Sequence, residues 1–138
     1  MIKKILTDTT KERKIKVGAG QTTSFLWEGE NVFSTPSMIA EMEETCRLLL
    51  KEEFLQDEDW DSVGTLVNIR HLKATPVATE VKLKARVIAV NDRRVTFEVD
   101  AVDKIEKIGE GLHERTVINV TEFRERFNKK LKKLETLS

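Results

Sequence analysis

The sequence has few of the residues that support several common classes of protein. Its 138 residues contain one cysteine, Cys46, so no disulfide can form within the chain and a disulfide scaffold is excluded. No apolar run approaches the roughly 18 residues of a membrane span, and residues 1–6 are not followed by the apolar stretch of a signal peptide. We therefore expect no membrane partner, and the cytoplasm is the default location.

Groups that bind metal ions or nucleic acid are also scarce. Two histidines and one cysteine do not give the spacing of a metal site, and no glycine-rich phosphate loop is present. Because 24 basic residues balance 24 acidic ones, the formal net charge is zero, which argues against a broad nucleic-acid-binding face. We expect no metal ion, no cofactor and no nucleic acid.

The charge is nevertheless sorted along the chain. Residues 3–16 carry six basic and two acidic side chains, residues 41–61 carry nine acidic and two basic, and residues 122–135 carry six basic and three acidic. Such runs are usually the solvated faces of amphipathic elements. The alternative is a basic rim that binds an anionic ligand, to which the tail would contribute Lys129, Lys130, Lys132 and Lys133.

One long helix is predicted from the sequence Ser34-Thr35-Pro36, in which a hydroxyl residue precedes proline as at many helix starts. Apolar residues then recur at steps of three and four as far as about Phe54, namely Met38, Ile39, Met42, Cys46, Leu49 and Leu50. Residues 56–62 break this period and predict a loop. A second, basic amphipathic helix is predicted over residues 121–137, capped by Thr121.

Residues 65–120 alternate between apolar and polar, which is typical of antiparallel strands buried on one face. The expected inward positions are Val67, Ile69 and His71; Val81, Leu83, Ala85, Val87 and Ala89; Val95, Phe97, Val99 and Ala101; and a fourth strand from Ile105 to Val120. Gly109 and Gly111 in that strand indicate a bulge or a close approach by another group. Residues 22–27 are a candidate for an additional strand.

One long helix and one long antiparallel sheet bury their apolar faces most economically when the sheet curls around the helix. We therefore predict an α+β fold of the hot-dog type, formed by a single domain over residues 1–138. The bare edges of such a sheet favour pairing with another copy. The expected assembly is a homodimer, with a dimer of dimers as a further possibility.

Two side chains stand out as candidates for catalysis. Glu43 falls on the rim of the helix's apolar stripe, where a partly desolvated carboxylate could act as a base or nucleophile. His71 lies on the apolar face of the first strand and could share one site with Glu43. The plainer alternatives are a glutamate that reaches water or an arginine, and a histidine satisfied within the core.

Other polar residues have equally plain alternatives. Thr35 could bind substrate beside the free N–H groups of the helix start, or simply cap that helix. Arg115, which shares a strand face with His113, could bind phosphate or form a cross-strand ion pair. Cys46 lies within the helix stripe and is expected to be a core residue.

Three segments in this order resemble the fluoroacetyl-CoA thioesterase-like family of hot-dog acyl-CoA thioesterases. They are VFST at residues 32–35 with ME at 42–43, GTLVNIRH at 64–71 with ATP at 74–76, and GEGLHERTVI at 109–118. The resemblance implies catalytic residues Thr35, Glu43 and His71, and substrate contacts from Gly64, His71 and Arg115. In the implied mechanism Glu43 attacks the thioester or activates water, His71 assists proton transfer, and Thr35 orients the carboxylate.

The function implied by the resemblance is hydrolysis of an acyl-CoA thioester. Family members specific for fluoroacetyl-CoA have a longer, phenylalanine-bearing segment before the helix, whereas here only residues 28–31 separate Trp27 from Val32. We therefore expect a short or medium acyl-CoA as substrate. The alternatives are a non-catalytic dimer that binds or senses acyl-CoA, and another hot-dog enzyme such as a hydratase.

Overall fold

The computed structural model describes residues 3–23 and 31–138. Five strands and two α-helices are formed within these ranges, together with a short 3-10 turn at Ala19–Gln21. The elements in chain order are β1 (Thr10–Lys16), α1 (Thr35–Glu53), β2 (Trp60–His71), β3 (Glu80–Asn91), β4 (Arg94–Val102), β5 (Lys107–Asn119) and α2 (Val120–Leu137).

Helix α1 follows from its cap and its apolar spacing, as the sequence predicts. The Ser34 side chain accepts a hydrogen bond from the backbone N–H of Ser37, so Ser34 is the N-cap, and Pro36 lies in the first turn. The alternative role of Thr35 as the cap is therefore wrong. The buried face of the helix consists of Met38, Met42, Thr45, Cys46, Leu49 and Leu50.

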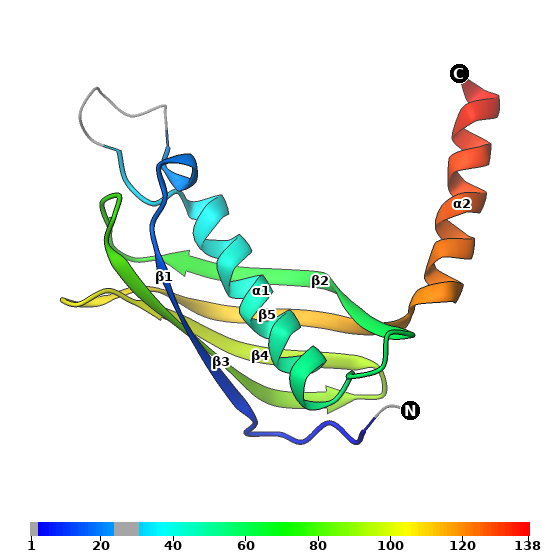
Figure 1. Cartoon of the computed structure of the whole chain (residues 1–138), viewed down its shortest axis with the longest axis horizontal. Helices are drawn as coiled ribbons and strands as arrows, with labels where there is room; N and C mark the ends of the chain where they lie inside the picture. The colour runs from blue at the N-terminus through cyan, green and yellow to red at the C-terminus, as the bar shows by residue number, and fades with distance from the viewer. Residues whose placement is uncertain (1–2, 24–30) are drawn as a thin grey trace.

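The five strands form one antiparallel sheet in the order β1-β3-β4-β5-β2, which curves around α1 (Figure 1). Strands β3 and β4 bury alternate residues against the helix, as their two-residue apolar period predicts. Their inward side chains include Val81, Leu83, Ala85, Val87, Val95, Phe97, Val99 and Ala101. This confirms the predicted hot-dog arrangement.

The register of the sheet corrects several predicted positions. A shift between Val87 and Ala89 turns Ala89 outward, where it is exposed rather than buried. Ile105 is exposed in the turn before β5. Strand β2 begins at Trp60, within the predicted loop, because Asp61 binds Arg47 of α1 and Ser62 is buried.

Strand β1 was not predicted at all. Its inward face consists of Lys11, Arg13 and Ile15, so it carries only one apolar residue. Arg13 instead binds α1 through the Glu41 carboxylate and the Thr45 hydroxyl. The pairing of β1 with β3 therefore depends on tertiary contacts that the alternation of apolar residues does not report.

The two glycines of β5 both sit at close approaches, as expected. A Cβ atom at Gly111, whose φ is +155°, would clash with the backbone carbonyl of Asn68 on β2. A Cβ at Gly109 would lie 2.6 Å from the Sδ atom of Met38. A register shift beside Gly109, where Ile108 is the extra residue, supplies the predicted bulge.

Helix α2 leaves the sheet where β5 ends, next to the start of β2, and points away from α1 (Figure 1). Its N-cap is Asn119, whose side chain accepts from the Glu122 N–H, rather than the predicted Thr121. Neither α2 nor any other described helix is long and apolar enough to cross a membrane.

Two expectations fall largely on residues 24–30, outside the described part of the chain. These are the strand at residues 22–27 and the short segment at residues 28–31. Within the described part, Thr22 forms an isolated antiparallel bridge with Phe33.

Candidate active site

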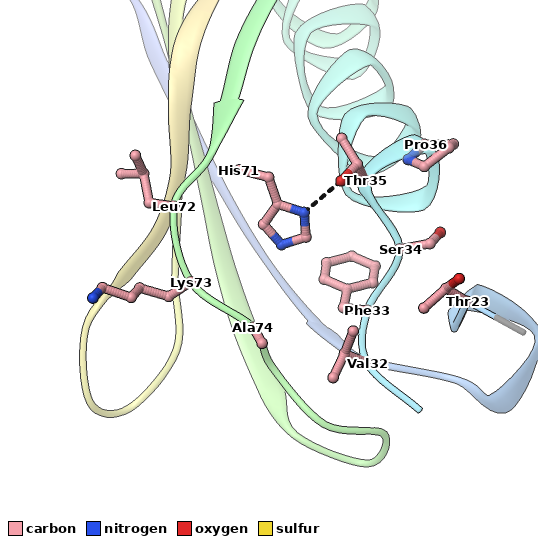
Figure 2. Close-up of a pocket in the computed structure, with 10 residues that line it drawn as sticks. All are labelled: Thr23, Val32, Phe33, Ser34, Thr35, Pro36, His71, Leu72, Lys73 and Ala74. Atoms are coloured by element: carbon pink, nitrogen blue, oxygen red, sulfur yellow. Dashed lines mark hydrogen bonds between the residues drawn. The ribbon is translucent and has the colours of Figure 1, made fainter. Parts of the chain in front are cut away.

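Thr35 and His71 meet at the N-terminal end of α1. Because Ser34 caps the helix, the Thr35 hydroxyl is not needed as the cap. Its Oγ1 atom instead lies 2.8 Å from Nδ1 of His71 (Figure 2). His71 is the last residue of β2, so this contact joins the start of the helix to the end of an edge strand. Both residues line a cavity of about 340 Å³, together with residues 32–34 and 72–74.

One nitrogen of the His71 ring, Nε2, is buried and has no hydrogen-bond partner among the described residues. Burial lowers the pKa of His71 below its ordinary value, although the nearby backbone of Lys73 opposes this shift. The imidazole is therefore neutral near pH 7. A neutral ring with one unpaired nitrogen beside a cavity is suited to transferring a proton to or from a bound molecule.

Glu43 lies farther along α1, on its half-buried face. Eight residues separate it from Thr35, which corresponds to about 12 Å along the helix axis. A Cβ atom at Gly64 of β2 would lie 3.4 Å from the Glu43 carboxylate, 3.1 Å from Cε1 of His113 and 3.6 Å from Nη1 of Arg115. The missing side chain of Gly64 thus leaves the space in which these three groups converge.

Arg115 is held beneath this cluster by hydrogen bonds to neutral groups. It is only 6% exposed, and it donates from Nε to the Ser62 hydroxyl at 2.7 Å and from Nη2 to the Ser62 carbonyl at 2.8 Å. Its Nη1 atom lies 3.1 Å from Nε2 of His113. These bonds take the place of the ion pair considered from the sequence, since no salt bridge of Arg115 is found among the described residues.

The same contacts fix the protonation of His113. A guanidinium only donates, so Nε2 of His113 accepts from Arg115, and the ring proton must reside on Nδ1, 2.8 Å from the Leu66 carbonyl. Burial is the largest cause that lowers the pKa of His113, and the positive charge of Arg115 acts in the same direction. A neutral His113 thus links Arg115 to the backbone of β2.

Of the residues predicted for the site, the structure therefore brings together two groups within one chain. Thr35 and His71 form one, and Glu43 lies with Gly64 and Arg115 in the other. Ser62 and His113 were not predicted to support the site. Ser62 fell in the expected loop, and His113 was noted only as a neighbour of Arg115 on the same strand face. Cys46 is a core residue as expected, and burial raises the pKa of its thiol. No cluster suited to a metal ion is found among the described residues.

Comparison with known proteins identifies the family of the chain. Residues 17–121 match the family model described as fluoroacetyl-CoA-specific thioesterase. The fluoroacetyl-CoA thioesterase of Streptantibioticus cattleyicolor is 34% identical over 105 residues, which cover 76% of this chain and 71% of that protein.

Solved structures show the same fold. A structure of the fluoroacetyl-CoA thioesterase superposes with a TM-score of 0.83 at 26% identity, covering 93% of this chain and 98% of the other. A mutant of that enzyme in complex with fluoroacetate and CoA gives 0.78 at 28% identity, covering 86% and 99%. A thioesterase superfamily member from Thermus thermophilus gives 0.86 at 22% identity, covering 96% and 98%. The chain therefore belongs to the fluoroacetyl-CoA-specific thioesterase family, a family of hot-dog hydrolases that cleave CoA thioesters.

Proposed function

We propose that this protein hydrolyses a short or medium acyl-CoA thioester to the free acid and CoA. The observation that carries the proposal is the contact between Thr35 and His71, which places a neutral imidazole beside a cavity at a helix N-terminus. Family membership supports thioester cleavage as the reaction. In the first turn of α1, Pro36 has no N–H and the N–H groups of Ser37 and Met38 donate to Ser34. The Thr35 N–H is therefore the backbone donor of this turn that suits the carbonyl oxygen of the substrate, which gains negative charge during attack.

The residues then take the following roles. Glu43 attacks the thioester carbonyl or removes a proton from the attacking water, and Thr35 and His71 orient one another. Where Glu43 takes the proton of the attacking water, the bond between carbon and sulfur breaks and that proton passes through the neutral His71 ring to the leaving CoA thiolate, which becomes the free thiol. Where Glu43 is the nucleophile, the thiolate leaves as an anhydride forms, and the water that then hydrolyses the anhydride supplies the proton of the thiol, again through His71.

Gly64 leaves room for the Glu43 carboxylate, and Arg115 lies beside it and helps to position it. The family resemblance also implies that Gly64 and Arg115 contact the substrate, and we propose that they do so at this cluster.

One chain alone leaves Glu43 and His71 apart, which supports a site completed by a second copy. Of the two edge strands, β1 has seven residues, five of them charged, whereas β2 has twelve residues with only two charged. Charged, short edges resist pairing and long, uncharged ones invite it. In addition, Leu66 and Val67 are 48% and 42% exposed. They point to opposite faces of β2, so a strand paired with β2 would cover apolar surface on both faces of the sheet. We therefore propose a homodimer in which β2 pairs with its own copy.

The register of that pairing would bring the two groups together. If two copies of β2 run antiparallel about a two-fold axis near Val67 or Asn68, His71 of the partner subunit lies opposite residues 62–64, counting the bulge at Thr65. Glu43 lies over Gly64 in this region. Each site would then combine Glu43 of one copy with Thr35 and His71 of the other. Assembly into a dimer of dimers and a cytoplasmic location stay predictions.

A thiol-release assay across acyl-CoA chain lengths tests the proposal. We expect free CoA from short or medium esters, and a loss of roughly a hundredfold or more in His71→Ala and in Glu43→Gln without loss of folding. The alternative is a non-catalytic dimer that binds acyl-CoA. It would raise its melting temperature with these esters while releasing no thiol over hours, and that result would rule out the enzyme.

A further inference from the structure

Most of helix α2 has no packing partner within the described part of its own chain. None of its residues is buried, and Phe127 and Leu134 are 54% and 51% exposed. Phe123 and Leu131 continue the same row along the helix, at steps of three and four residues. We call Phe123, Phe127, Leu131 and Leu134 the α2 stripe. Most of the stability of a helix in a protein comes from the packing of its apolar face, so we expect another surface to cover this stripe.

The path of α2 indicates where that surface lies. The first turns of the helix and the outer face of the sheet, the face turned away from α1, enclose a groove of about 380 Å³ lined by Phe123, Phe127, Val63, Thr65, Thr116 and Ile118. The stripe therefore faces the outer side of β2 and β5. Beyond this groove the helix runs across the strand direction and past the free edge of β2 (Figure 1).

Charge marks a complementary surface elsewhere on the same sheet. The outer face of β4 and β5 holds a groove of about 350 Å³ whose charged lining residues are Glu98, Asp100, Glu110 and Lys107. Lys107 pairs with Glu110 and Arg86 of β3 pairs with Glu98, so Asp100 leaves the groove with one net negative charge. Leu112, 37% exposed, supplies an apolar wall. We call this the acidic groove. Helix α2 carries six basic and three acidic residues, and the acidic groove of its own chain lies at the far end of β5 from α2.

Lys130 occupies a special position on α2. At about 100° per residue it lies only about 20° from Phe123, within the apolar stripe, whereas Lys132 lies about 180° away on the opposite side. Lys130 also lines the groove beneath the helix. No ion pair of Lys130 is found in the part of the chain that the structure describes. A surface that covers the stripe must therefore also accept one positive charge.

We propose that α2 of each copy lies across the outer face of the partner's sheet, with the α2 stripe and Lys130 seated over Leu112 and the acidic groove of that copy. The inference rests on the dimer through β2 proposed above. Antiparallel pairing places the end of β2 of one copy, and hence its acidic groove, beside the start of β2 of the other, where α2 emerges.

The length of α2 and the spacing of the strands are consistent with this placement. From Phe123 to Leu134 the helix advances about 16 Å, and neighbouring strands lie about 4.8 Å apart. A helix that starts over its own β2 therefore reaches β2, β5 and β4 of the partner in turn. Lys130, about 10 Å beyond Phe123, arrives over β5 of the partner, the strand that carries Glu110 and Leu112.

Sedimentation velocity over a range of protein concentrations tests the proposal with single charge reversals of the full chain. We expect Lys130→Glu and Glu110→Lys each to raise the dissociation constant of the dimer by about tenfold or more, and the double variant to restore it. Lys132→Glu makes the same change in charge on the opposite side of α2 and is expected to leave the dimer unchanged. Because all three positions are exposed, none of these changes removes a buried contact of the protomer.

The other outcomes overturn the proposal in distinguishable ways. If Lys130→Glu and Lys132→Glu change the dissociation constant of the dimer equally, or if neither changes it, then α2 does not bind the acidic groove of the partner through Lys130. An unchanged dimer with a raised KM for acyl-CoA in Lys130→Glu would assign the lysine to a rim that binds the CoA phosphates. A wild-type protein that is monomeric throughout would exclude the β2 dimer as well, whereas thiol release by the wild type reports on the enzymatic activity independently.

Discussion

The Thr35 hydroxyl lies 2.8 Å from Nδ1 of His71, so the start of α1 and the end of β2 are joined by one side-chain hydrogen bond. The bond exists because Ser34 takes the N-cap and releases the neighbouring hydroxyl from that task. It orients the His71 ring while leaving Nε2 without a partner among the described residues. We therefore treat Thr35 as the residue that positions the proposed proton donor.

Removing this hydroxyl should impair catalysis more than stability. We expect Thr35→Val, which keeps the shape of the side chain, to lower kcat by about 10- to 100-fold, because the His71 ring loses its orientation. The free energy of unfolding should fall by about 1 kcal/mol or less, since one exposed hydrogen bond is lost. Thr35→Ser retains the hydroxyl and should retain most of the activity. Steady-state kinetics and thermal melts separate these effects, and equal activity in the valine and serine variants would contradict the assignment.

The pH dependence of hydrolysis should report the buried state of His71. Burial disfavours the charged imidazole, so the folded pKa lies below the ordinary value of about 6.5. The neutral form therefore persists as the pH falls through 6.5, and the acid limb of kcat/KM assigned to His71 should have its midpoint below that pH. Rates measured from pH 5 to 8 check this. A midpoint above 7 would show that His71 is charged in the resting protein.

The glycines of the sheet should differ sharply in what a methyl group does. At Gly64 a Cβ would press on Cε1 of His113 at 3.1 Å and would contact the Glu43 carboxylate at 3.4 Å, so Gly64→Ala should shift His113, fill the space beside Glu43 and lower kcat by about tenfold or more. At Gly111 the Cβ would meet the backbone of β2, and the positive φ adds strain. Gly111→Ala should therefore cost about 2 kcal/mol or more of stability. Steady-state kinetics measure the first effect and a chemical denaturation series measures the second, and a Gly64→Ala variant with full activity would count against the placement of Glu43.

Arg115 should act on stability and turnover, and also on substrate affinity through the contact proposed for it. Arg115→Lys cannot reproduce the bonds to both Ser62 groups and His113, so we expect the free energy of unfolding to fall by about 2 to 4 kcal/mol, with a lower kcat and a higher KM. Arg94→Lys, at a side chain 60% exposed, is the matched control and should be nearly neutral. Wild-type stability together with an unchanged KM in Arg115→Lys would contradict both roles.

The sequence predicts α1, β3 and β4 well because their apolar periods agree with their buried faces. It misses β1, where only Ile15 of the inward side chains is apolar, and it starts β2 late because Asp61 and Ser62 read as loop residues. These elements are held by ion pairs and hydrogen bonds to distant residues, as in the contacts of Arg13 with Glu41 and of Arg47 with Asp61. Such partners leave no periodic signal in the chain.

The site shows the same division. Glu43 and His71 are identifiable from their places on a helix rim and a strand face. Their positions relative to each other depend on the register of β2 and, in our proposal, on a second copy. Spacing along one chain contains neither piece of information, so the sequence predicts the residues better than it predicts the geometry between them.

The most direct test of the account is activity in mixed dimers. Glu43→Gln and His71→Ala chains should each be inactive, but refolding or co-expressing them in equal amounts should restore thiol release to about a quarter of the wild-type rate, because half of the dimers are mixed and each has one intact site of two. If each site lies within one chain, the mixture stays as inactive as the two variants alone. Recovery of about a quarter is the result that we predict, and no recovery would contradict the shared site.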